Sequence, residues 1–317
     1  MKSNDDDDDG GSETTFIAKG LSKWDFDIFR LQSTVLPLTK VTMSVFYKYN
    51  LIPLLGLDEN ICINFFMAIE HKYKPYPQLT YHTSLHAADV VHSMYNLMEE
   101  TQRLGFTTTP LKIFSALVAA AIHDVGHPGL TNPFLCAIHH PLAILYNDTS
   151  VLENHHAATA FTIAQQPECN IFAPLAPDDQ TAARKQIIHM VLHTDMNKHS
   201  KLLADCRGSS VAQIDSDVLF AFLIHAADLS SMSKAWPLCK TWASHIMTEL
   251  FAQGDQEAAL GLPIGYDRRQ TTLAKSQLAF IDLIGRPLWA TWDALIGVAQ
   301  SPQSLAVEEN RRVWGKI

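Results

Sequence analysis

Several features are rare or missing in this 317-residue sequence, and each excludes a class of protein. The five cysteines form no C-x-x-C pair and are odd in number, which argues against a disulfide scaffold and predicts a reducing, cytoplasmic location. The net charge is −9 and no dense stripe of Lys and Arg occurs, so we expect no nucleic-acid partner. The most apolar stretch, Leu111–Ile122, is shorter than the roughly 20 residues of a membrane span and predicts a buried core helix instead.

Hydrophobic residues recur at spacings of three and four along most of the chain, a pattern typical of helices. The clearest segments are residues 58–74, 111–125, 181–206 and 217–255. Pro and Gly separate these segments, and no sustained alternation bounded by turns predicts strands. The acidic start, residues 1–15, has no apolar segment and predicts a disordered tail or linker. We therefore expect one compact all-α domain of many helices over residues 16–317.

The stretch YHTSLHAADVVHS places His82, His86, Asp89 and His92 at offsets of 4, 3 and 3. This spacing predicts one helix that carries all four side chains on the same side. Its apolar neighbours indicate that this side faces inward, where imidazoles and carboxylates are costly unless they are paired or bind a metal. Taken alone, the stretch fits a polar stripe under a loop equally well.

Four further stretches place the same residue types at the polar ends or faces of apolar helices. They contain His123, Asp124 and His127 in HDVGHPG, His225 and Asp228 in HAADLSS, Glu153 in VLENHH, and Thr194 and Asp195 in VLHTDMNKH. Five such stretches together favour a metal site over purely structural roles.

Two imidazoles and two carboxylates are available as ligands from His86, His123, Asp124 and Asp228. This mixed nitrogen and oxygen set suits Zn²⁺, with water in the open positions of a catalytic site. A carboxylate such as Asp124 can bridge to a second ion such as Mg²⁺, which accepts few carboxylates and keeps several waters. Two ions about 3.5–4 Å apart can activate a bridging hydroxide for in-line displacement at phosphorus.

The remaining polar residues of these stretches suit supporting roles. His127, Glu153 and Thr194 can accept hydrogen bonds from waters of the second ion. His82 is left over as a proton donor for the leaving oxygen. Asp89 and His92 are expected to be structural or to support the ligands.

Six segments resemble, in order, the signature segments of class I cyclic nucleotide phosphodiesterase catalytic domains. They are YHTSLHAADVVHS, HDVGHPG, YNDTSVLENHH, TDMNKH, HAADLSS and AKSQLAFIDLIGRPLW. The resemblance extends over roughly residues 26–314 and is closest to the cAMP-specific members. It implies a helical domain of the HD type with a bimetal site in a deep pocket. It also implies metal-dependent hydrolysis of the 3′ phosphoester bond of a small cyclic nucleotide to the 5′-monophosphate.

The same resemblance implies a role for each matched residue. The zinc ligands match His86, His123, Asp124 and Asp228, with Asp124 shared by the second ion, usually Mg²⁺ or Mn²⁺. The positions that hold waters of the second ion match His127, Glu153 and Thr194. His82 matches the general acid, and Glu249 matches the carboxylate that orients it.

The substrate pocket is also implied by the resemblance. Gln277 matches the glutamine that reads the purine edge, and Phe280 and Ile246 match the apolar jaws around the base. Tyr81 and Met196 match pocket-lining residues. Gln277 and Phe280 are three apart and share a helix face, although Phe280 by itself is equally typical of a core aromatic.

Five positions depart from the family pattern. Three of them lie near the metals: Thr83, Gly126 and His193 stand where the family usually has an asparagine, an aspartate and a small residue. We expect the site to survive, with altered metal affinity at most, and the His193 side chain to point to solvent rather than to the second ion.

Near the base, Ser231 and Cys239 replace an asparagine and a tyrosine. The tyrosine of relatives helps to fix the amide of the glutamine in the orientation that suits adenine. Because an amide offers both a donor and an acceptor, a rotated Gln277 would suit guanine. We therefore expect hydrolysis of cGMP as well as cAMP.

Two alternatives remain at this stage. An HD-type nucleotidase or phosphohydrolase shares the histidine and aspartate set, although the pairs Gln277 with Phe280 and His82 with Glu249 argue against it. A catalytically inactive module that binds cyclic nucleotides is the other. Regulatory domains in a longer polypeptide are compatible with the acidic start.

Overall fold

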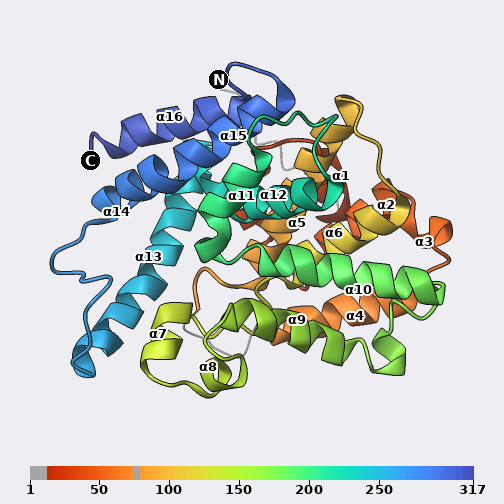
Figure 1. Cartoon of the computed structure of the whole chain (residues 1–317), viewed down its shortest axis with the longest axis horizontal. Helices are drawn as coiled ribbons and strands as arrows, with labels where there is room; N and C mark the ends of the chain where they lie inside the picture. Colours follow the sequence, from red (N-terminus) through yellow and green to blue (C-terminus); the bar gives the residue numbers. More distant parts are fainter. Residues whose placement is uncertain (1–12, 74–78) are drawn as a thin grey trace, which may run out of the picture.

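The computed structural model describes residues 13–73 and 79–317, and the regular structure in these ranges is helical without a strand (Figure 1). The all-α prediction is therefore confirmed. The α-helices are α1 (Glu13–Gly20), α2 (Pro37–Lys48), α3 (Leu51–Leu54), α4 (Glu59–Lys72), α5 (Ser84–Arg103), α6 (Pro110–Ile122), α7 (Asn132–Ala137), α8 (Pro141–Leu145), α9 (Val151–Ile163), α10 (Pro177–Leu192), α11 (His199–Cys206), α12 (Ser216–Asp228), α13 (Trp236–Ala259), α14 (Leu273–Phe280), α15 (Arg286–Ile296) and α16 (Pro302–Trp314). Short 3₁₀ helices are η1 (Ile28–Leu31), η2 (Pro167–Cys169), η3 (Met196–Lys198) and η4 (Ser230–Ser233), and η5 (Ile281–Gly285) is a π-helix.

The expected acidic tail falls mostly outside the described residues. Of residues 1–15, only 13–15 are described, and they form the start of α1. None of the helices in the described part of the chain combines the length and the apolar character needed to cross a membrane.

The helix ends follow local capping chemistry. The Thr109 hydroxyl accepts from the N–H of Lys112 at 3.2 Å at the start of α6, and Asp215 accepts from the N–H of Asp217 at 2.8 Å at the start of α12. Such caps satisfy N–H groups that the helix itself leaves unpaired. Both apolar helices therefore begin at a defined residue, which also helps to define where their polar C-terminal ends lie.

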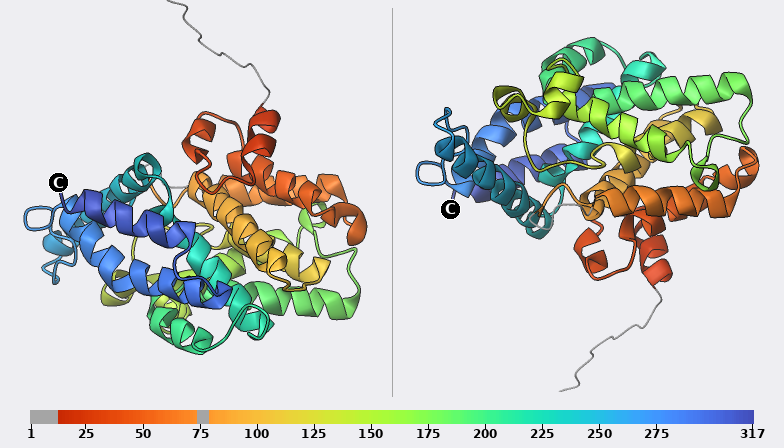
Figure 2. Two further views of the ribbon diagram at one scale, coloured as in Figure 1. Left: turned by 90° about the horizontal axis from the view of Figure 1, so that it is seen from above. Right: turned by 90° about the horizontal axis from the view of Figure 1, so that it is seen from below.

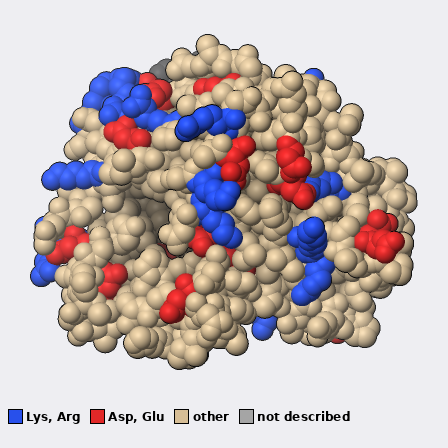
Figure 3. Space-filling model, in the orientation of Figure 1, with Lys and Arg blue, Asp and Glu red and all other residues tan. Residues whose placement is uncertain are grey.

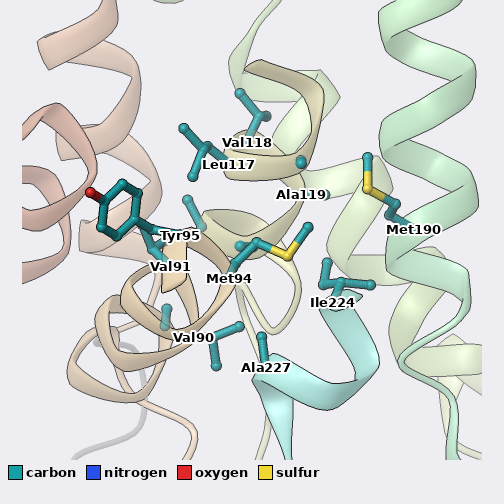
Figure 4. Packing of buried hydrophobic residues seen from close by; sticks show 14 of the residues in the cluster. Val90, Val91, Met94, Tyr95, Leu117, Val118, Ala119, Met190, Ile224 and Ala227 are labelled. Atoms are coloured by element: carbon teal, nitrogen blue, oxygen red, sulfur yellow. The ribbon is translucent and has the colours of Figure 1, made fainter. Parts of the chain in front are cut away.

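The core is built around α5, α6, α10 and α12, which pack against one another. Figure 4 shows Val90 and Met94 of α5 on the side of Ala227 and Ile224 of α12, with Leu117 of α6 and Met190 of α10 in the same cluster. The same cluster of buried apolar residues continues from Ile17 to Trp314. This packing holds the start of α5 and the ends of α6 and α12 in fixed relative positions, because closely packed apolar side chains leave little freedom for one helix to slide past another.

The central helices lie between two outer groups. Figure 1 shows α13, α14 and α16 on one side of the molecule and α4 and α9 on the other, and the views in Figure 2 agree. The start of α5 and the ends of α6 and α12 carry the predicted ligands, so the polar site forms where these ends meet.

Candidate active site

The four predicted ligands of the first metal come together in the structure. The ligand atoms of His86, His123, Asp124 and Asp228 all lie within 4.8 Å of one another. His86 lies in the first turn of α5, His123 and Asp124 directly follow α6, and Asp228 ends α12. The His86 Nε2 atom lies 3.1 Å from Asp228 Oδ1, and His123 Nε2 lies 3.1 Å from Asp124 Oδ2.

The hydrogen bonding and the pKa of His123 indicate that this cluster suits a cation. His123 Nδ1 donates to the carbonyl of Ala120 at 2.9 Å, while its buried Nε2 has no hydrogen-bond partner among the described residues. Burial alone would lower the pKa of His123, but the carboxylates of Asp124 and Asp228 outweigh it and raise the pKa well above its usual value. A divalent cation would satisfy the same two carboxylates and the Nε2 lone pair, so the residues fit a metal ion.

A second group of ligand atoms adjoins the first. The ligand atoms of Asp124, His127 and His156 also lie within 4.8 Å of one another. His156 Nδ1 donates to the carbonyl of Val125 at 2.9 Å, and its Nε2 lies 3.6 Å from Asp124 Oδ1. No role was predicted for His156, although its i, i+3 spacing from Glu153 on α9 could have indicated one.

Glu153 and Thr194 lie on neighbouring elements. The Glu153 carboxylate is buried and accepts from Asn132 Nδ2 at 3.0 and 3.2 Å. Burial and the nearby Asp195 raise its pKa to about 7. The Thr194 hydroxyl donates to the carbonyl of Val191 at 2.9 Å, which leaves its lone pairs free to accept from water.

His82 and Glu249 form a closely held pair at the edge of these clusters. His82 Nδ1 lies 2.5 Å from Glu249 Oε2, and the other carboxylate oxygen accepts from the N–H groups of Thr80, Tyr81 and His82 at 2.8, 2.5 and 3.1 Å. The His82 ring stacks on His127, with centroids 3.6 Å apart and planes 9° apart. The Glu249 carboxylate thus holds both the backbone and the ring of His82.

The prediction that His82 shares a helix with His86 was wrong. Helix α5 begins at Ser84, with Thr83 as its N-cap in an extended conformation. The backbone N–H groups that precede α5 donate to Glu249 rather than joining a helix. His82 lies in the loop before α5 and His86 in its first turn, and both side chains nevertheless reach the same site.

Four of the predicted pocket residues lie on α13 and α14. Ile246 of α13 and Phe280 of α14 are half-buried and pack against the same core. Gln277 is 8% exposed, and its amide makes no hydrogen bond to any of the described residues. Figure 3 shows a hollow in this face of the molecule over α13.

The other pocket candidates differ in exposure. Tyr81 is buried, with its ring centroid 4.4 Å from that of His86. Met196 in η3 is 41% exposed, and Ser231 in η4 is half-buried. Cys239 is buried against Trp314 of α16, and burial raises the pKa of its thiol to about 12.

His193 belongs to neither group of ligand atoms found in the described part of the chain, in line with the expectation that it does not face the second ion. Its ring is half-buried, and its Nδ1 donates to the carbonyl of His189, one turn earlier in α10, at 2.7 Å. The two imidazole centroids lie 4.2 Å apart. The side chain therefore folds back along the helix.

Gly126 has a positive φ of +76° between Asp124 and His127. A β-carbon there would lie 3.2 Å from His155 Nε2. Because glycine adopts this conformation without strain, the departure from the family pattern fits the local backbone.

Asp89 and His92 are structural. Asp89 accepts from Trp242 Nε1 at 3.0 Å and pairs with the fully buried Lys234 at 3.2 Å. Lys234 also donates to the carbonyl of Trp24 at 3.0 Å, so this network joins α5 and α13 to the N-terminal segment. His92 lies against Gly20 of the same segment, with Nε2 3.4 Å from its carbonyl oxygen.

The Asp89→Asn variant is expected to lose about 3–5 kcal/mol of unfolding free energy, because it leaves the Lys234 ammonium buried without its counter-charge. Urea unfolding measures this loss. Asp205→Asn is the matched control, because the side chains of Lys201 and Asp205 are 77% and 40% exposed and such a pair contributes less than about 1 kcal/mol. Equal losses in both variants would contradict the structural role of Asp89.

The chain is similar in sequence to proteins of known family. The sequence profile described as 3'5'-cyclic nucleotide phosphodiesterase matches residues 81–305. A 3',5'-cyclic-AMP phosphodiesterase, isoform F, from Drosophila melanogaster is 41% identical over 309 residues, covering 92% of this chain and 46% of that protein. A 3',5'-cyclic-AMP phosphodiesterase 4C from Mus musculus is 38% identical over 310 residues, covering 92% of this chain and 45% of that protein. The chain thus spans about half the length of these curated relatives.

A solved structure has the same fold. The phosphodiesterase domain of the RhoPDE fusion protein from the choanoflagellate Salpingoeca rosetta aligns with a TM-score of 0.85 and 28% identity, covering 95% of this chain and 96% of that one. The fold and the clustered histidines and aspartates define a helical protein with a candidate metal centre. The chain belongs to the 3′,5′-cyclic nucleotide phosphodiesterase family.

Proposed function

We propose that this chain hydrolyses the 3′ phosphoester bond of cAMP, and also of cGMP, to the 5′-monophosphates. The observation that carries the proposal is the His82–Glu249 pair stacked on His127 beside the ligand cluster, which combines a proton donor with a cation site. The names of the Drosophila and mouse relatives support cAMP as a substrate.

We infer that His86, His123, Asp124 and Asp228 hold Zn²⁺, and that Asp124 also holds Mg²⁺ or Mn²⁺ with waters near His127, Glu153 and Thr194. His156 joins this second group because of its position beside Asp124. Bound ions would supply positive charge for the phosphate and lower the pKa of coordinated water. Since the protein carries a net charge of −9, the ions rather than basic side chains would attract the anionic substrate.

His82 would act as the general acid. Its Nδ1 proton faces Glu249, so its Nε2 is the nitrogen that can give a proton to the leaving 3′ oxygen. Burial alone would lower the pKa of His82, but the Glu249 carboxylate contributes to a net rise, which favours the protonated ring. The three backbone hydrogen bonds to Glu249 would hold the pair in place between turnovers.

The base would lie between Ile246 and Phe280, with its edge toward Gln277. An aromatic ring and an aliphatic side chain offer two apolar surfaces to a planar base. Tyr81, Met196, Ser231 and Cys239 would line the rest of the pocket.

Separate turnover of cAMP and cGMP by the purified protein with Mg²⁺ tests the proposal, with the 5′-monophosphates as the expected products. Release of inorganic phosphate from 5′-AMP, without turnover of either cyclic nucleotide, would support a nucleotidase. Binding of cyclic nucleotide without any turnover would support an inactive module.

The Cys239→Tyr variant is expected to shift the ratio of kcat/KM for cAMP over cGMP by about two- to tenfold toward cAMP, the effect of one net hydrogen bond on the Gln277 amide. In the present chain this amide has no partner among the described residues, and the thiol of Cys239 is only a weak donor. Steady-state kinetics with each substrate measures the ratio.

Cys239→Phe is the matched control, because it adds the same ring beside Trp314 without the hydroxyl. An equal shift in both variants would mean that ring bulk, and not the orientation of the amide, sets the preference.

A further inference from the structure

His225 is a fully buried histidine to which the proposed reaction gives no role. It lies on α12 one turn before Asp228. Its Nδ1 lies 3.0 Å from the carbonyl oxygen of His193, and its Nε2 lies 2.9 Å from Nδ1 of the buried His199. The imidazole thus connects α12 to the end of α10 and to the start of α11.

The hydrogen-bond partners fix one proton arrangement. A carbonyl oxygen only accepts, so His225 Nδ1 carries a proton and donates it to His193. In a neutral ring Nε2 then accepts, so His199 Nδ1 carries the proton of the second bond. Burial lowers the pKa of His225 to about 4 and also lowers the pKa of His199, which keeps both rings neutral near pH 7.

The carbonyl that His225 holds belongs to the residue before Thr194. Among the other hydrogen bonds of this turn, the Thr194 hydroxyl donates to the carbonyl of Val191 at 2.9 Å, and Asp195 accepts from the Ser150 hydroxyl at 2.7 Å. Among the described residues, the bond from His225 is the side-chain hydrogen bond that joins this turn to α12, the helix that carries the ligand Asp228. The packing of α10 against α6 and α12 places this turn near the metal cluster, and the bond from His225 sets the local position of the His193 carbonyl and of Thr194 beside it.

We propose that His225 is a positioning residue that fixes the Thr194 turn relative to Asp228, and thereby the acceptor oxygen that holds a water of the second metal ion. The inference rests on the proposed function, which assigns the second ion to Asp124 and the neighbouring waters. His199 supports this role, because its Nδ1 donates to His225 Nε2 and thereby leaves Nδ1 of the neutral His225 ring as the nitrogen that donates to the His193 carbonyl.

Three variants separate the effect of the hydrogen-bond donor of His225 from the effect of its side-chain volume. His225→Asn places an amide N–H close to the position of Nδ1 and keeps the bond to His193. His225→Leu fills similar space without a donor. His225→Gln keeps a polar amide that can accept from His199, but it places the amide one carbon further along and away from the His193 carbonyl.

The probe is Mn²⁺, titrated into zinc-loaded protein and followed as free Mn²⁺ by electron paramagnetic resonance, with zinc content from elemental analysis. We expect the Leu and Gln variants to bind Mn²⁺ at least about tenfold more weakly than wild type, with unchanged zinc content, as for loss of an outer partner of a metal site. The Asn variant should bind Mn²⁺ like the wild type. If the Leu variant does not fold, the Asn and Gln pair decides the question.

Mn²⁺ affinity equal to wild type in the Leu or Gln variant would overturn the inference, as would an Asn variant as weak as the Gln variant. The proposed function fails separately, if the wild-type protein binds Mn²⁺ but turns over no cyclic nucleotide. The comparison between variants uses binding alone and stays decisive in that case.

Discussion

Replacing His82 by alanine is expected to lower kcat for cAMP by about 10²–10⁴-fold, the contribution of one well-placed general acid. The His82 ring lies beside the metal cluster and is held by two contacts, with Glu249 at Nδ1 and His127 stacked against its face. Since His82 is not among the clustered ligand atoms, zinc content should stay unchanged. Steady-state kinetics and elemental analysis of the same preparation measure both outcomes.

His71→Ala is the control for this variant, because His71 is exposed in the last turn of α4, and its activity should match the wild type. A His82→Ala protein that keeps its zinc and turns over cAMP within about threefold of wild type would exclude His82 as general acid, since that role accounts for at least about 10²-fold.

The pH profile gives an independent test through Glu249. A general acid must be protonated, so activity falls as the pH rises through its pKa. Burial would lower the pKa of His82, and the charge and hydrogen bond of Glu249 act in the opposite direction. Glu249→Gln removes that charge, so the alkaline limb of kcat should move to lower pH than in the wild type. An unmoved limb would assign it to another group.

The ligand cluster could be predicted from the sequence because its residues lie at the ends of strongly periodic helices. His123 and Asp124 follow α6 directly and Asp228 ends α12, so the apolar pattern also located the polar site. His82 was misplaced because nothing local distinguishes a loop before a helix from its first turn. The deciding interactions come from Glu249, far along the chain.

The sequence holds one local signal for His156, its spacing of three residues from Glu153, and none for the surroundings of the purine pocket. His155 and His156 are adjacent, and only the rotation of α9 decides which of them faces Asp124. The contact of Cys239 with Trp314 follows from the packing of α13 near α16. Such tertiary contacts decide the surroundings of Gln277, whereas the sequence supplies only its helix face.

Asp124 should prove the residue on which both ions depend, because its two oxygens face different groups of ligands. Oδ2 lies 3.1 Å from His123 Nε2, and Oδ1 lies 3.6 Å from His156 Nε2. Asp124→Asn is therefore expected to weaken binding of both ions by more than about 100-fold, which exceeds the effect of losing an outer partner, and to abolish turnover. Metal analysis after dialysis and cAMP turnover measure the two losses.

The same substitution should also remove the stabilisation that bound metal gives to the fold. Burial would raise the pKa of Asp124, but the charge and hydrogen bond of His123 outweigh it and lower this pKa well below its usual value, so Asp124→Asn also loses this pairing in the metal-free protein. Metal that binds only the native state stabilises it further by mass action. A chelator should therefore lower the Tm of the wild type and leave that of Asp124→Asn unchanged. Asp205→Asn, at an exposed residue outside both ligand groups, should keep its response to the chelator. A chelator effect of wild-type size in Asp124→Asn would mean that the ions are held without this carboxylate, and that Asp228 and the histidines suffice for the site.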